Sequence, residues 1–155
     1  MTDQNVHIHQ FENGLMLIVE EMSGVQSAAF SMLVPAGSIY DQPGQYGTAS
    51  MLADWLTRGA GEQNSRELSS TLDNLGLQRS EHVGARHTSL YGACVADKLV
   101  DCLRIYGDIL LRPQLPDDQF EPVKLGAEHS LLSVEDDPQR KTMIELRRRS
   151  FTRPW

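Results

Sequence analysis

The chain has 155 residues, of which 40% are hydrophobic and 23% are charged, a composition typical of a globular domain with one core. Its formal net charge of −7 disfavours nucleic acid and anionic lipid as partners, because both are negatively charged. No apolar run approaches the roughly 20 residues needed to cross a bilayer, and the amino terminus shows no targeting signal. We therefore expect one cytoplasmic domain over residues 1–155, with neither nucleic acid nor a membrane as a partner.

The first part of the chain predicts three β-strands. Residues 6–10 and 15–22 alternate in polarity and are separated by an Asn-Gly turn at 13–14, which is a strong hairpin signal. A third strand is predicted at 26–34, and the Pro-Ala-Gly sequence at 35–37 ends it. This region is therefore expected to contribute antiparallel sheet.

The middle of the chain predicts two helices followed by two strands. Apolar residues at helical spacing predict a helix over 48–56. A second helix is predicted to begin with Ser65 as its N-cap and to end at Gly76. Strands are predicted at 77–83 and 87–95, so the chain returns to sheet after these two helices.

Three further helices are predicted at 97–111, 116–134 and 138–150, with prolines between them. Cys94 and Cys102 lie in apolar surroundings without CxxC spacing, so we expect both to be buried free thiols. The complete order of elements predicts an α+β fold in which helices pack on one face of an antiparallel sheet.

Several sequence blocks resemble the inverted-motif zinc peptidases in their order and spacing. The main block is VPAGSIYDQPGQYGTASMLADWLTRGA at 34–60, which is similar to the strand, Ala-Gly-Ser turn and HxxEH helix of that family. The other blocks are FENGL at 11–15, SREL at 65–68, LG at 75–76, GDILLRP at 107–113, FEPVK at 120–124 and EDDP at 135–138. The chain thus resembles the family of pitrilysin, insulysin and mitochondrial processing peptidase. The resemblance implies a processing-peptidase half-domain and, because family domains are longer, only its amino-terminal part, incomplete at the carboxyl end.

The resemblance places the metal motif of this family at residues 50–54. Active members bind zinc through two histidines one helical turn apart, about 5.4 Å along the axis, and a glutamate polarises the bound water. Here Ser50 stands at the first ligand position, Ala53 at the base position and Asp54 at the second ligand position, while Ser130 stands where the third ligand, a glutamate, is expected. Alanine cannot transfer a proton, and a neutral hydroxyl is a poor zinc ligand. We therefore expect no catalytic activity of the chain alone and no bound cofactor.

Metal binding by other residues remains an alternative. A small shift along the helix would put Glu128 at the third ligand position, and His129 beside it is the best candidate for a rearranged ligand. Asp54 and Glu128 alone supply two carboxylates, which suit a hard cation weakly and do not make a zinc site. Asp54, Glu128 and His129 are therefore weak metal candidates.

The resemblance also implies how a peptide would bind, namely as an added strand at a sheet edge. The corresponding strand here carries Ser80, Glu81 and His82. These features predict a non-catalytic domain that is the partner or substrate-holding half of a two-part metallopeptidase. Its expected partners are a peptide or protein substrate and a zinc-bearing subunit or second domain of the same family. Two alternatives are an active metalloendopeptidase with rearranged ligands and a stand-alone structural or binding module on the same fold.

Overall fold

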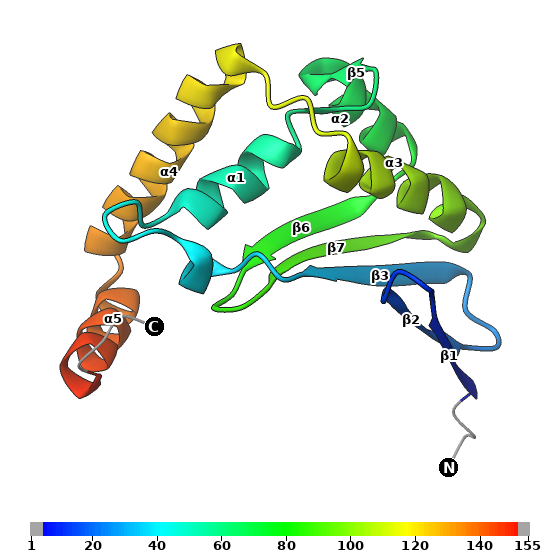
Figure 1. The fold of residues 1–155 in the computed structure, drawn as a ribbon, viewed down its shortest axis with the longest axis horizontal. Coiled ribbons are helices and arrows are strands. Elements are labelled where there is room, and N and C mark those ends of the chain that lie inside the picture. Colours follow the sequence, from blue (N-terminus) through cyan, green and yellow to red (C-terminus); the bar gives the residue numbers. More distant parts are fainter. Residues whose placement is uncertain (1–4, 152–155) are drawn as a thin grey trace.

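A three-stranded antiparallel sheet is the centre of the computed structural model, which describes residues 5–151 (Figure 1). Its strands are β3 (Ser27–Val34), β7 (Thr88–Val95) and β6 (Gln78–Val83), in that order across the sheet. The middle strand β7 pairs with both neighbours. Strand β6 is therefore an edge strand, and its outer side has no strand partner within residues 5–151.

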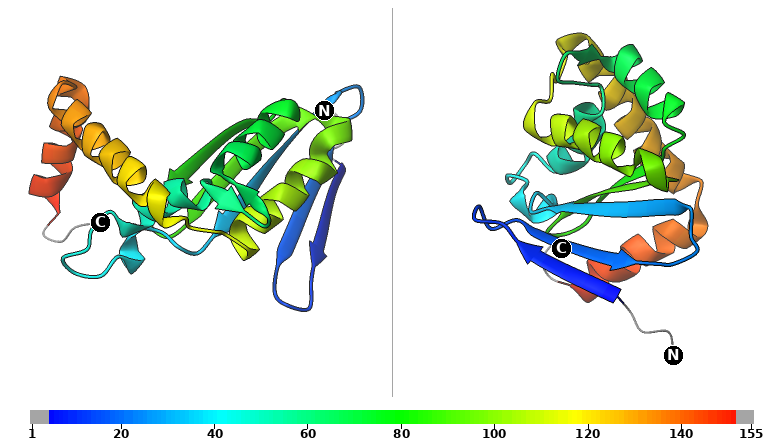
Figure 2. Two further views of the ribbon diagram at one scale, coloured as in Figure 1. Left: turned by 90° about the horizontal axis from the view of Figure 1, so that it is seen from above. Right: turned by 90° about the vertical axis from the view of Figure 1, so that its right-hand side faces the viewer.

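The predicted amino-terminal hairpin is confirmed, but it is separate from this sheet. Strands β1 (Asn5–Gln10) and β2 (Met16–Glu21) pair only with each other among the residues described, and every residue in both is exposed. In the right-hand view of Figure 2 the hairpin lies below the central sheet, whereas the helices at 48–56, 65–74 and 99–111 lie above it. The local turn signal thus predicted the hairpin correctly, but it did not show that the hairpin would be separate from the sheet that contains β3.

Three helices cover one face of the central sheet (Figures 1 and 2). They are α1 (Thr48–Leu56), α2 (Ser65–Asn74) and α3 (Leu99–Leu111). The core between helices and sheet contains Leu68, Leu72, Leu90, Cys102, Tyr106 and Ile109, each at most 1% exposed. This arrangement confirms the predicted α+β class with helices on one face of an antiparallel sheet.

Close packing across this core depends on Gly92 in the middle strand. The ring of Phe30 from β3 lies 4.9 Å, centroid to centroid, from the ring of Tyr106 in α3, and the two rings are nearly perpendicular. A Cβ atom on Gly92 would lie 2.3 Å from the Phe30 ring. Because no real contact is that short, glycine at this position lets the aromatic pair fill the space between sheet and helix.

The start of α2 differs by one residue from the prediction. The Asn64 side chain accepts hydrogen bonds from the backbone N–H groups of Arg66 and Glu67, and the Glu67 carboxylate accepts one from the Asn64 N–H. This reciprocal arrangement is a capping box. The N-cap is therefore Asn64, and the prediction of Ser65 was wrong because an amide side chain one residue earlier reaches the same free N–H groups.

Several short elements connect these larger ones. They are the two-residue strands β4 (Gly59–Ala60) and β5 (Gln63–Asn64) and the 3₁₀ turns Ser38–Tyr40, Ala96–Lys98 and Asp117–Gln119. The 3₁₀ turn before the fourth helix means that this helix begins at Phe120, four residues later than predicted. Such short turns lack the periodicity from which sequence patterns predict secondary structure.

Helices α4 (Phe120–Glu135) and α5 (Pro138–Ser150) extend away from the sheet (Figure 2). The base of α4 is held against α1, where the Trp55 and Phe120 rings lie 5.1 Å apart and Trp55 Nε1 donates to the Pro116 carbonyl at 3.1 Å. Beyond that base both helices expose large apolar side chains: Leu125, Leu131, Leu132, Met143, Ile144 and Leu146. Within residues 5–151 no helix is long and apolar enough to cross a bilayer.

Candidate functional site

The loop between β3 and α1 holds α1, the motif helix that contains residues 50–54, against the edge strand β6. Backbone N–H groups of residues 37–39 donate to carbonyls of residues 84–86 in the β6–β7 turn, at 3.0–3.1 Å. The Asp41 carboxylate then accepts from the N–H groups of Gly47 and Ala49, at 2.8 and 2.9 Å, at the start of α1. The loop before α1 is thereby joined to the β6–β7 turn, and α1 itself packs against strand β6.

The three motif positions on α1 have different surroundings. Ser50 is exposed, whereas Ala53 is 6% exposed and belongs to the packed side of the helix. The Asp54 carboxylate is paired with the Arg58 guanidinium one turn later, with N–O distances of 3.0, 3.2 and 3.3 Å. Arg58 thus neutralises the carboxylate at the second ligand position with a cation from the same helix.

These residues do not fit the zinc site of the family. Ser50 supplies a neutral hydroxyl, Ala53 supplies no donor, and Asp54 is already engaged by a guanidinium. The candidate third ligands, Glu128, His129 and Ser130, lie exposed on α4. Over residues 5–151 no three His, Cys, Asp or Glu side chains gather in a group that could hold a metal ion. In particular, Asp54, Glu128 and His129 do not form such a group.

The three residues of the proposed peptide-binding edge do not share one face of β6. Glu81 lies opposite Leu90 in β7, which is 1% exposed and belongs to the core, so the Glu81 side chain is on the helix-covered face. Ser80 and His82 alternate with it and are on the other face. Only Glu81 of the three therefore faces the motif helix.

Glu81 is the most perturbed acid of the site. Its Oε1 atom is buried and has no hydrogen-bond partner within residues 5–151. Burial raises the pKa of this carboxyl; the Arg79 guanidinium lowers it, and the negative charge of Asp54 raises it again. The sequence placed Asp54 in a metal motif and Glu81 in a peptide edge, but the fold brings their charges into interaction.

Tyr106 in α3 is a further member of this neighbourhood that sequence reasoning did not identify. It is fully buried, and its hydroxyl donates to the Tyr91 carbonyl at 3.4 Å. Burial, with a smaller contribution from the charge of Glu81, raises the pKa of Tyr106 to about 12. The apolar stripe of α3 predicts which side of this helix is buried. It does not show which strand residue each buried side chain of the helix will contact.

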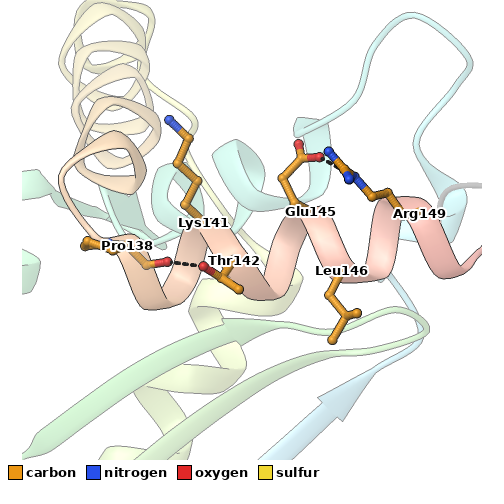
Figure 3. A pocket seen from close by; sticks show the side chains of 6 residues that line it. All are labelled: Pro138, Lys141, Thr142, Glu145, Leu146 and Arg149. Atoms are coloured by element: carbon orange, nitrogen blue, oxygen red, sulfur yellow. Dashed lines mark hydrogen bonds and ion pairs between the residues drawn. The ribbon is translucent and has the colours of Figure 1, made fainter.

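A shallow depression on α5 is unrelated to this site. Its lining residues are Pro138, Lys141, Thr142, Glu145, Leu146 and Arg149, all from one helix (Figure 3). Within that helix the Thr142 hydroxyl donates to the Pro138 carbonyl at 2.7 Å, and Arg149 pairs with Glu145 at 3.7 Å. Because neither the motif helix nor β6 contributes to it, the depression adds no group to the degenerate motif.

Comparison with known protein families identifies the family of the chain. The family model for insulinase, peptidase family M16, matches residues 16–153. The chain therefore belongs to the insulinase (M16) peptidase family, which confirms the resemblance seen in the sequence blocks.

Relatives of the chain are larger proteins. An uncharacterized zinc protease of Rickettsia bellii is 21% identical over 135 residues, which are 87% of this chain and 33% of that protein. Mitochondrial-processing peptidase subunit beta of Caenorhabditis elegans is 27% identical over 109 residues, which are 70% of this chain and 24% of that subunit. The chain thus spans about a quarter to a third of these relatives.

A solved structure shows the same fold. The crystal structure of a peptidase M16 inactive domain from Pseudomonas fluorescens superposes with a TM-score of 0.79 at 17% sequence identity. The match covers 92% of this chain and 35% of that chain. At this level of identity the likeness establishes the fold alone.

Proposed function

We propose that the chain is a non-catalytic part of an M16 peptidase, which holds an extended peptide while a zinc-bearing subunit or second domain of the same family cleaves it. The observation that carries this proposal is the Asp54–Arg58 pair at the degenerate motif. A carboxylate already bound by a guanidinium replaces one ligand, and alanine replaces the base. The solved M16 domain of similar fold is itself described as inactive, which supports the non-catalytic part of the proposal.

Absence of the base disfavours hydrolysis independently of the metal. A general base has to lie within hydrogen-bond reach of the water that it activates. Ala53 offers no proton acceptor and is packed in the interior, so no side chain at this position reaches solvent. A metal bound by Asp54 would, in addition, have to displace Arg58 from two or more hydrogen bonds.

The free edge of β6 supports the peptide-holding part of the proposal. An edge strand presents unpaired backbone N–H and C=O groups, and an extended peptide forms main-chain hydrogen bonds with them. Helix α1 packs on β6, so one side of an added strand would lie beneath the motif helix. Side chains of the peptide would then alternate between this covered face and the open face of the sheet.

The exposed apolar side chains of α4 and α5 support the partner part of the proposal. Large exposed apolar side chains, where they gather on one surface, usually mark a contact with another protein or domain. These two helices project from the sheet instead of packing on it (Figure 1). A zinc-bearing half of the peptidase docked there would complete the two-part enzyme.

Metal content and proteolysis together test the proposal. The purified protein, dialysed against zinc and then freed of excess metal, should retain only substoichiometric zinc and should not cleave unstructured peptides. Adding the zinc-bearing family member should produce peptide cleavage, and a chelator should block this cleavage. Stoichiometric zinc with chelator-sensitive cleavage by the chain alone, both lost on Asp54→Ala, would instead establish the rearranged metallopeptidase. A monomer that binds neither peptide nor a family partner would establish a stand-alone module.

A further inference from the structure

One carboxylate on the free sheet edge has no partner in the part of the chain that the structure describes. The Glu81 Oε1 atom is shielded from solvent but accepts no hydrogen bond there. Burying an acceptor without a partner is unfavourable, and it is more so for a charged one. Strand β6 is also one of the two edge strands of the central sheet, with no neighbour on its outer side within residues 5–151. An unsatisfied acceptor therefore stands where a further strand could be added.

Nearby cations are engaged with other acids. Arg79 shares the helix-covered face with Glu81, two residues earlier, but its ion pair is with Asp73 at 3.5 Å. Arg58 forms its three contacts with Asp54. The charge of Asp54 disfavours the ionised form of Glu81, as burial does. Neither arginine therefore forms an ion pair with Glu81, and the Glu81 carboxylate lacks a cationic partner among residues 5–151.

We propose that Glu81 selects a basic side chain, lysine or arginine, in the peptide that adds to β6; this inference rests on the proposed peptide-holding function. Residues directly opposite each other in neighbouring strands point to the same face, with Cβ atoms about 4.5–5.5 Å apart. A lysine or arginine opposite Glu81 would bring an N–H donor to the Glu81 carboxylate beneath α1. Charge-assisted hydrogen bonds are the strong ones, particularly where water is partly excluded.

Selection at this point depends on one residue of the edge. Ser80 and His82 are on the other face of β6 and would meet the neighbouring peptide positions instead. A glutamate opposite Glu81 would add a third negative charge near Asp54, and an aliphatic residue would bury the rest of the Glu81 carboxylate without a donor. The order of preference is therefore basic, then aliphatic, then acidic.

The test uses the full-length protein and labelled, extended peptides of threonine and serine that differ only at the central residue, which is lysine, norleucine or glutamate. Fluorescence anisotropy should show that the lysine peptide binds about tenfold more tightly than the norleucine peptide, with the glutamate peptide weakest. Glu81→Gln should reduce the preference for lysine to about twofold or less, because the amide lacks the charge. Glu12→Gln, the same chemical change on the exposed turn between β1 and β2, should keep the full preference.

The results separate this inference from the function on which it rests. Equal affinity of the native protein for the lysine and norleucine peptides would overturn selection by Glu81 and leave strand addition intact. A lysine preference that survives Glu81→Gln would overturn it as well. Failure of all three peptides to bind would overturn both the selection and the peptide-holding function.

Discussion

Replacing Gly37 with alanine should destabilise the protein strongly, although the backbone there is ordinary. Gly37 has φ −88° and ψ 179°, an extended conformation that any residue can adopt. An added Cβ, however, would lie 2.5 Å from the Ala85 carbonyl oxygen and 2.5 Å from the Arg86 carbonyl carbon. Both are backbone atoms, so no side-chain rotation can relieve the clash.

The expected cost follows from the hydrogen bonds at this contact. Relief of the clash requires residues 37–39 to separate from residues 84–86, which are joined by three backbone hydrogen bonds of 3.0–3.1 Å. At about 1 kcal/mol for each bond, the loss is roughly 3 kcal/mol. The smaller conformational freedom of alanine in the unfolded chain offsets about 0.5 kcal/mol of this. We therefore expect the free energy of unfolding to fall by about 2–3 kcal/mol.

Urea unfolding followed by circular dichroism measures this difference. Gly107→Ala is the matched control, because Gly107 lies within α3 and an added Cβ there meets no atom within 4 Å. That variant should gain about 0.5–1 kcal/mol from the better helix propensity of alanine. A Gly37→Ala protein within about 0.5 kcal/mol of the native one would refute the reasoning, since ordinary surface substitutions fall in that range.

Three further predictions concern titration, thiol reactivity and helix capping. Glu81→Gln should raise the free energy of unfolding at neutral pH by roughly 1 kcal/mol. The pKa of Glu81 is raised in the folded state, so its protonated form favours folding at low pH and this contribution to stability is lost as pH rises. Urea unfolding should therefore show the variant to be no more stable than the native protein at pH values below 4.5, the ordinary pKa of a glutamate. Burial and a hydrogen bond with Cys94 raise the pKa of Cys102 to about 11. A coloured disulfide reagent should therefore modify these two buried free thiols only as fast as the protein unfolds, and rapid modification of the folded protein would contradict this. Asn64→Ala should cost about 1 kcal/mol in thermal unfolding by removing the α2 capping box, while the exposed Asn74→Ala should not.

Local periodicity was sufficient to predict most helices and strands. The helices at 48–56 and 138–150 begin and end where predicted, since the apolar spacing of the first and the Asp137 cap and Pro138 of the second lie within or next to the helix. Differences occur where local signals compete, as at the start of α2, or where the element is a short 3₁₀ turn, as before α4. Sequence patterns thus predict elements whose causes lie within a few residues.

Cys94 and Cys102 show the same limit within the core. Their apolar surroundings predicted burial, and both are buried free thiols. Their contact with each other, one from β7 and one from α3, was not predictable, because it depends on how that helix crosses that strand. Packing between elements that are separate in the sequence carries this information.

The sequence by itself determined that Ser50, Ala53 and Asp54 stand at residues 50–54, where the resemblance to the M16 family places its metal motif. Only the tertiary structure decided what surrounds them. Arg58 pairs with Asp54, and β6 takes the edge of the sheet with Glu81 beneath α1 and without a hydrogen bond to Oε1 from residues 5–151. Burial and the mutual repulsion of charges depend on distances in space, so they arise only when the helix and the strand pack together.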